Sequence, residues 1–124
     1  MLRLELDPVP AVVGTARRRA REEVRSALAE SADIDELLDD VALVVSELVT
    51  NAIVHGVPPV IVEVGADVRD PGCRVVITCI DSGPWDGSPP DPIRGRGLLL
   101  VRALAEVEID ADSDGTRVTA TLHR

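Results

Sequence analysis

Three polar side chains recur at a constant spacing within an apolar segment in the middle of the sequence. Glu47, Asn51 and His55 stand four residues apart, so that a helix would place them in one row. A carboxylate, a carboxamide and an imidazole are costly in apolar surroundings unless they meet water, a ligand or one another. An ordinary solvated helix face explains the same row, so this pattern alone leaves ligand binding and solvation as alternatives.

Two short motifs adjoin predicted strands. Asp81-Ser82-Gly83 directly follows a β-branched run, and Gly115-Thr116 leads into the last one. An acidic residue at a strand end, followed by a glycine that permits close backbone approach, can accept a hydrogen bond from the amino group of a ligand. A plain turn explains the first motif and a hairpin turn explains the second, so neither is specific alone.

A third motif, Gly95-Arg96-Gly97-Leu98, opens a predicted apolar helix. The free N–H groups and the positive end of the helix dipole make such a start an anion site, with a flexible helix entry as the alternative. We exclude a Rossmann fingerprint, because Leu100 stands where its third glycine belongs and no strand precedes the motif. The chain has arginine but no lysine, so backbone N–H groups and arginines must bind any phosphate.

The elements that position these motifs follow from hydrophobic periodicity and turn residues. The predicted strands cover 1–7, 60–64, 74–80, 107–111 and 117–122, and the predicted helices cover 10–31, 33–55 and 97–105. Asp33, with Glu36 three residues later, is the predicted N-cap of the second helix. The buried stripe of the first helix is predicted to comprise Ala16, Ala20, Val24, Ala27 and Leu28, and that of the second Val41, Val45, Leu48 and Ala52.

In this order, strands joined directly by a turn predominate over strands that alternate with helices. We therefore predict an α+β fold, a two-layer α/β sandwich whose mixed, mostly antiparallel sheet carries the helices on one face. The length of 124 residues predicts one domain, 1–124.

Composition excludes several classes of function. The formal net charge of −9 and the single aromatic residue, Trp85, argue against binding of DNA or RNA. No apolar run reaches the ~18 residues of a membrane span, and the first residues lack the apolar stretch of a signal peptide, so a cytoplasmic location is expected. Cys73 and Cys79 would lie about 20 Å apart on one strand, so they are predicted to be core residues and not a disulfide.

Taken together, the motifs form an ordered set: Glu-x-x-x-Asn on a helix, Asp-x-Gly after a strand, Gly-x-Gly at a helix start and Gly-Thr before a final strand. This order resembles the nucleotide-binding (Bergerat) fold shared by gyrase, Hsp90, histidine kinases and MutL, known as the GHKL superfamily. The run Val-Ser-Glu-Leu-Val-Thr-Asn-Ala-x-x-His-Gly, residues 45–56, resembles the anti-sigma-factor serine/threonine kinases, the group of SpoIIAB and RsbW. The resemblance extends from the first helix to Leu122.

The resemblance implies a role for each matching residue. Asn51 would coordinate Mg²⁺ bound to the ATP phosphates, and Glu47 would be the general base. Asp81 would accept a hydrogen bond from the adenine amino group, and Gly83 would give the base room. The hydroxyl of Thr116 would support the adenine pocket. Phosphates would be held by the backbone N–H groups of the third motif, which are those of Gly95, Arg96, Gly97 and Leu98. His55 would have a supporting role.

The sequence departs from the family pattern at the adenine motif. Where the family has Asp-x-Gly-x-Gly, the last position here is Trp85, which would either cover the adenine or fill the core. The segment that should form a lid over the phosphates, 84–94, is short, which puts the exclusion of water from the reacting phosphate in question. Arg94 or Arg96 would have to supply the positive charge near the phosphates.

We therefore expect an ATP-binding, Mg²⁺-dependent serine/threonine kinase that phosphorylates an anti-anti-sigma (STAS-type) antagonist protein and otherwise binds a sigma factor. Many members of this group dimerise, which adds a homodimer to the expectations. Arginines on the outer face of the first helix are a candidate partner surface, with a solvated face as the alternative: Arg17, Arg18, Arg21 and Arg25. The rival prediction is a non-catalytic, nucleotide-gated binding module. The kinase half of a two-component histidine kinase fits poorly, because the sequence shows no phosphoacceptor helix pair.

Overall fold

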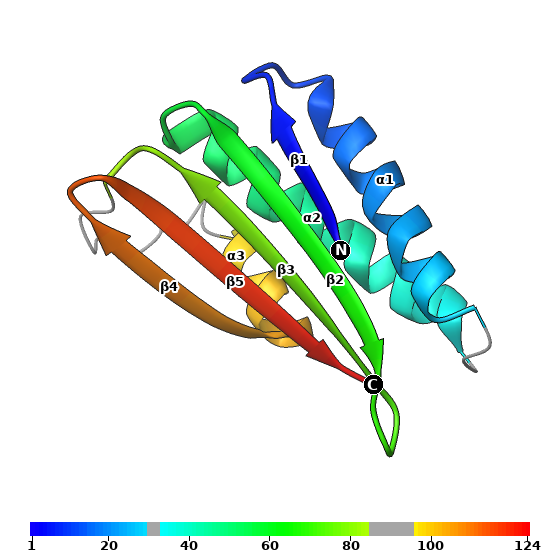
Figure 1. Ribbon diagram of the computed structural model, residues 1–124. Coiled ribbons are helices and arrows are strands. Elements are labelled where there is room, and N and C mark those ends of the chain that lie inside the picture. Colours follow the sequence, from blue (N-terminus) through cyan, green and yellow to red (C-terminus); the bar gives the residue numbers. More distant parts are fainter. Residues whose placement is uncertain (30–32, 85–95) are drawn as a thin grey trace.

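The computed structural model describes residues 1–29, 33–84 and 96–124, and for Arg96 only the backbone. Within these residues five strands and three helices follow one another along the chain (Figure 1). The strands are β1 (Leu2–Leu6), β2 (Val60–Val68), β3 (Cys73–Asp81), β4 (Glu106–Asp112) and β5 (Gly115–His123). The helices are α1 (Val12–Ala27), α2 (Ile34–His55) and α3 (Arg96–Leu104).

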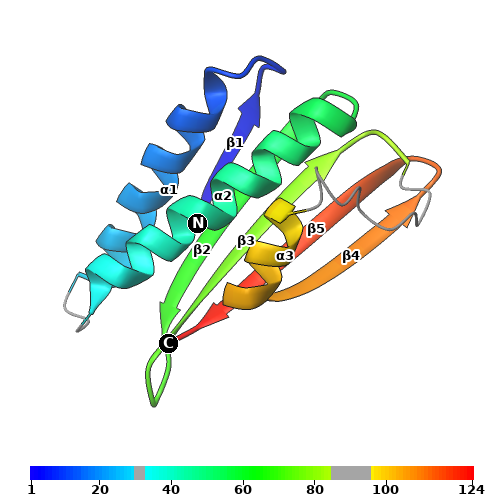
Figure 2. The same cartoon turned by 180° about the vertical axis from the view of Figure 1, so that it is seen from behind.

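The five strands form one sheet in the order β1-β2-β3-β5-β4. Every neighbouring pair is antiparallel. Short turns join β2 to β3 and β4 to β5, whereas helices lie in the connections from β1 to β2 and from β3 to β5. All three helices lie on the same face of the sheet, as the two opposite views show (Figures 1 and 2). The predicted α+β sandwich with helices on one face is confirmed, and the sheet is antiparallel throughout its described pairs.

The core lies between the sheet and α2. The predicted stripe of α2 is buried as expected, and alternate residues of the central strands face it: Val60, Val62, Val64, Val75, Ile77 and Cys79. Both cysteines are buried and unbonded, as predicted. Burial, and secondarily the charge of Asp81, raises the pKa of the Cys79 thiol to about 12. The thiol is therefore protonated at neutral pH and unreactive.

Two predictions about the helix ends were wrong. The first helix ends at Ala27 and not near Ser31, and Ala27 itself is exposed. Asp33 stands at the N-cap position of α2, but its side chain makes no capping hydrogen bond. Its backbone has the left-handed φ of 58°, whereas a capping side chain needs extended backbone to reach the first amides of the helix. Residues 30–32 lie outside the described part of the chain.

No helix in the described ranges is long and apolar enough to cross a membrane.

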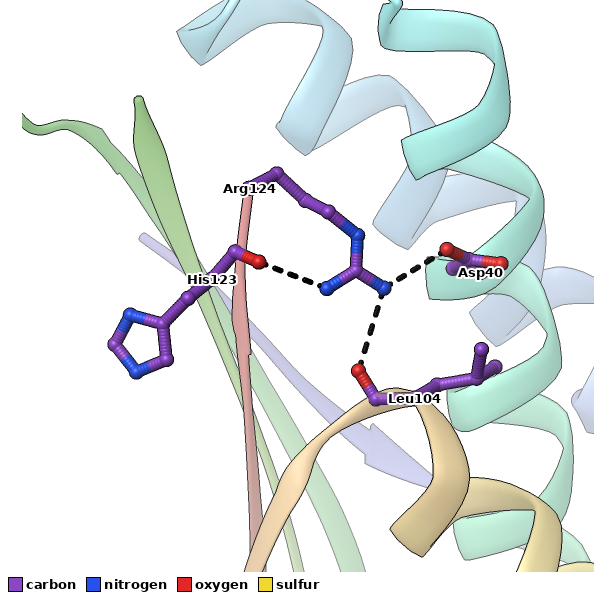
Figure 3. A network of polar contacts seen from close by, with 4 residues as sticks. All are labelled: Asp40, Leu104, His123 and Arg124. Atoms are coloured by element: carbon purple, nitrogen blue, oxygen red, sulfur yellow. Dashed lines mark hydrogen bonds and ion pairs between the residues drawn. The ribbon is translucent and has the colours of Figure 1, made fainter. Parts of the chain in front are cut away.

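Arg124 joins the last strand to two helices (Figure 3). Its Nη2 donates to Oδ2 of Asp40 on α2 at 2.9 Å and to the carbonyl oxygen of Leu104, the last residue of α3, at 3.3 Å. Its Nη1 donates to the carbonyl oxygen of His123 at 2.9 Å. A cation at the C-terminal carbonyls of a helix is favourable, so this cluster fixes the C-terminal end of α3 against α2.

We expect Asp40→Asn to lower the free energy of unfolding by about 1 kcal/mol, because the Asp40–Arg124 pair is partly shielded from water. Chemical denaturation followed by circular dichroism measures this change. Glu22→Gln is the matched control, since the Arg18–Glu22 pair is exposed and its atoms lie 3.9 Å apart. Equal stability of Asp40→Asn and the wild type would contradict the prediction.

Candidate functional site

The row of polar residues on α2 divides into two parts. Glu47 and Asn51 are half-buried, whereas His55, in the last turn, is exposed. The buried stripe of α2 packs on the sheet, so Glu47 and Asn51 emerge at its edge, one turn apart. A half-buried carboxylate and amide can meet a ligand there. The exposure of His55 favours a solvated side chain, and the supporting role predicted for it stays a prediction.

The carboxylate of Glu47 lies directly against the start of α3. A Cβ atom added at Gly97 would overlap Oε2 of Glu47 and would lie 2.9 Å from its Cδ. Gly97 is buried, and only a residue without a side chain allows this approach. The structure thus brings the helix start of the Gly-x-Gly motif to Glu47, although the two residues are far apart in the sequence.

Asp81, the last residue of β3, is held by backbone amides from two segments. Its Oδ1 accepts hydrogen bonds from the N–H of Gly83 at 2.7 Å and of Val57 at 3.3 Å. The N–H of Ser82 in turn donates to the carbonyl oxygen of Val57 at 2.8 Å. Within the described residues, Oδ2 of Asp81 accepts no hydrogen bond.

Thr116 supports the same loop from β5. Thr116 stands opposite Asp81 in the β3–β5 pairing, and its buried hydroxyl donates to the carbonyl oxygen of Gly83 at 2.7 Å. Gly115 lies against the carbonyl oxygen of Asp81, which a Cβ atom would approach to 2.6 Å. The hydroxyl of Thr116 therefore acts on the backbone of the Asp-Ser-Gly motif.

Helix α2 connects the two clusters of the site, the one around Glu47 and the one around Asp81. Glu47 and Asn51 lie on α2, and Val57, which binds Asp81, follows directly after its end. Nine residues of helical rise separate Glu47 from Gly56, which corresponds to about 13 Å along the axis. The end of β3 therefore contacts the segment after α2, whereas the start of α3 contacts α2 at Glu47, earlier along the same helix. Both contacts lie on the helical side of the sheet (Figure 2).

Part of the predicted site lies outside the described residues. This applies to Gly95, Arg94, Trp85 and the predicted lid, and also to the side chain of Arg96. Leu98 is described and is buried beside Gly97 at the start of α3. No group of three His, Cys, Asp or Glu side chains that could hold a metal occurs in the part of the chain that the structure covers.

A family model, described as a histidine kinase-like ATPase domain, matches residues 8–122. The chain belongs to this ATPase family. An ATPase domain implies ATP binding, and the matched residues include both Glu47 and Asp81. No match is found among curated protein sequences.

Solved structures of the family agree with the fold. The chain resembles the RsbU and RsbW domains of a Mycobacterium tuberculosis protein, with 28% identity, a TM-score of 0.71, and coverage of 99% of this chain and 32% of that one. A blue-light activated histidine kinase of Erythrobacter litoralis gives 25% identity and a TM-score of 0.54 over 70% of this chain and 30% of that chain. The histidine kinase domain of that protein, at 21% identity and a TM-score of 0.55 over 89% and 60% of the two chains, supports the fold alone. The chain thus spans about a third of the length of the first two proteins.

The residues of this ATPase domain fit ATP with a divalent cation. Asp81 has one carboxylate oxygen fixed by two amides, and the other accepts no hydrogen bond from the described residues, which suits an amino group of a purine. Asn51 offers a half-buried amide oxygen one turn from Glu47, and an oxygen ligand of this kind suits Mg²⁺. The two ends of the site thus match the two ends of a nucleotide.

The arginines of α1 have partners within the domain. Nη1 of Arg17 donates to Oγ of Ser46 at 3.3 Å, next to Glu47 on α2. Arg18 pairs with a glutamate one turn later on the same helix, and Arg21 pairs with Asp39 of α2, each at 3.9 Å. The contacts of Arg17 and Arg21 tie α1 to α2, and the partner surface predicted on this face stays a prediction.

Sequence analysis missed the role of the segment that follows α2. Gly56 appears there only as the last residue of the run 45–56, and Val57 is not singled out. In the structure both residues contact Asp81, which lies 24 residues beyond Val57. Gly56, the last residue of the run 45–56, is the sequence signal that could have indicated this contact.

Proposed function

We propose that this chain is a Mg²⁺-dependent protein kinase of the anti-sigma type, which transfers the γ-phosphoryl group of ATP to a serine or threonine of an antagonist protein. The observation that carries the proposal is the position of Glu47, half-buried against the start of α3 on the helix whose end holds Asp81. The similarity to a structure that contains an RsbW domain supports the same branch of the family.

Each residue of the site has one task in this proposal. Asp81 binds the adenine amino group through Oδ2, and Thr116 keeps the Asp-Ser-Gly backbone in place. The N–H groups of Gly95, Arg96, Gly97 and Leu98 bind phosphate oxygens at the start of α3. Asn51 holds the cation. Bound ATP would supply the phosphoryl group, and the Mg²⁺ ion would neutralise part of the negative charge of the phosphates.

Glu47 orients the attacking hydroxyl and accepts its proton. The serine or threonine oxygen forms a bond to the γ-phosphorus, the bond between that phosphorus and the bridging oxygen of ADP breaks, and the hydroxyl proton passes to the carboxylate. The chain contributes positioning and electrostatics, which account for most of the catalysis of phosphoryl transfer. Packing against Gly97 restricts the Glu47 side chain to the start of α3, where the phosphates are expected.

The partners that we propose are an anti-anti-sigma (STAS-type) protein as phosphoryl acceptor and a sigma factor as the regulated protein. The alternative is a non-catalytic module in which nucleotide binding controls the affinity for a partner. Titration calorimetry with ATP and Mg²⁺, followed by phosphate transfer from labelled ATP to STAS-type candidates, separates the two. ATP binding with transfer supports the kinase, and ATP binding without transfer to any candidate supports the module. Absence of ATP binding would contradict both.

We expect Asn51→Ala to remove the Mg²⁺ dependence of ATP binding. Asn51 is the protein ligand that we assign to the cation, so the wild type should bind ATP about tenfold more tightly with Mg²⁺ than with a chelator. The variant should give the same affinity in both conditions. Calorimetry with and without EDTA makes the measurement, and Thr50→Ala, an exposed neighbour on α2, is the control. A variant that keeps the full Mg²⁺ effect would show that the cation is held elsewhere.

A further inference from the structure

Gly56 ends α2 in a conformation that does not require glycine. Its N–H donates to the carbonyl oxygen of Ala52 at 3.0 Å, and its φ of −88° and ψ of −173° are extended values open to any residue. The backbone angles alone therefore do not explain why a glycine stands here. Another physical reason is needed.

Space beside Asp81 supplies that reason. A Cβ atom at Gly56 would lie 2.5 Å from Cγ and 2.8 Å from Oδ1 of Asp81, and 2.5 Å from the carbonyl oxygen of Ala52. Real Cβ atoms do not come this close, so an alanine here would displace the Asp81 carboxylate or the backbone. The Asp81 carboxylate occupies the space that a side chain at position 56 would fill.

Backbone hydrogen bonds hold the Asp81 carboxylate in this position beside Gly56. Val57 N donates to Oδ1 of Asp81 from one side and Gly83 N from the other. The bond from Ser82 N to the carbonyl oxygen of Val57 locks the two segments together. As a result, Oδ1 is occupied, whereas Oδ2 accepts no hydrogen bond from the residues that the structure describes, and we assign Oδ2 to the ligand.

We propose that Gly56 and the amide of Val57 are positioning elements for base recognition, because they fix which oxygen of Asp81 faces the 6-amino group of the purine. This inference rests on the proposed ATP binding and extends it to the selection of the base. Since Gly56 and Val57 directly follow α2, the position of Asp81 is set relative to Asn51 and Glu47. The junction thereby fixes the separation between the base end and the phosphate end of the site.

The test compares two nucleotides that differ only at the 6-amino group: ATP and purine riboside triphosphate, which lacks it. We expect Gly56→Ala to weaken ATP binding by about tenfold, the effect of losing a hydrogen bond to a charged group, and to leave the affinity for the second nucleotide unchanged. Gly65→Ala is the matched control, because Gly65 is also half-buried and an added Cβ would lie 3.8 Å from the nearest side-chain atom. It should leave both affinities as in the wild type.

A purely structural role of Gly56 would weaken the binding of both nucleotides equally, and that result would overturn the inference, as would an unchanged affinity for ATP. Val57→Pro serves if Gly56→Ala does not fold. It deletes the amide donor to Asp81, and the extended backbone of Gly56 is compatible with a following proline. The same selective loss for ATP is expected. A wild type that binds neither nucleotide would contradict the proposed function, whereas equal losses in the variant would contradict only this inference.

Discussion

Glu47→Gln is expected to reduce the rate of phosphate transfer to the acceptor protein by about 100- to 10,000-fold, the range over which a positioned general base contributes. Glutamine preserves the size of the side chain and its packing against Gly97, but it cannot accept the hydroxyl proton. The affinity for ATP should stay close to that of the wild type, because no contact to the nucleotide is assigned to Glu47. Single-turnover transfer from labelled ATP, with calorimetry on the same samples, gives both quantities.

Glu36→Gln is the control for this experiment. Glu36 also lies on α2, in its first turn, and is exposed far from the start of α3. Removal of its charge changes the net charge of the protein by the same amount and should leave the transfer rate unchanged. Full activity of Glu47→Gln would remove Glu47 from the catalytic role, and an equal loss in both variants would indicate a general effect of charge.

Asp81→Asn is expected to weaken ATP binding by about 10- to 100-fold, because a hydrogen bond to a charged acceptor is lost. The amide oxygen can still accept the bonds from Gly83 and Val57, which leaves the NH₂ group at the position of Oδ2. That group is a donor and would face the donor of the adenine amino group. The variant should therefore fold normally and fail mainly in base recognition.

Calorimetric titration with ATP measures this loss, and thermal unfolding without ligand checks the fold. Asp110→Asn is the matched control, because Asp110 is exposed on β4 and belongs to neither cluster of the site. It should bind ATP like the wild type. An unchanged affinity of Asp81→Asn would show that the base binds elsewhere, and our placement of the pocket would then be wrong.

Local periodicity predicted most of the fold correctly. The alternation of β-branched residues located β2 and β3, although both strands extend beyond the predicted 60–64 and 74–80. The spacing of apolar residues identified the buried stripe of α2, and with it the face that carries Glu47 and Asn51. These features depend on residues close in sequence, so a linear pattern contains them.

Backbone conformation at the ends of elements was less predictable. Asp33 and Glu36 have the composition of a capping box, yet Asp33 adopts a left-handed conformation and its side chain forms no cap. Asp81 was assigned to a loop and is the last residue of β3, because it pairs with Thr116. Pairing and strain at such positions depend on partners that are distant in the sequence.

The order of residue types along the chain determined the family, the helix row with its carboxylate and amide, and the acidic residue at the strand end. Only the folded molecule decided that Glu47 touches Gly97, that Oδ1 of Asp81 is held by Val57 and that Gly56 makes room for it. The physical reason is that periodic burial arises from neighbours a few residues apart. The availability of one carboxylate oxygen depends instead on atoms that come together when the sheet and the helices pack.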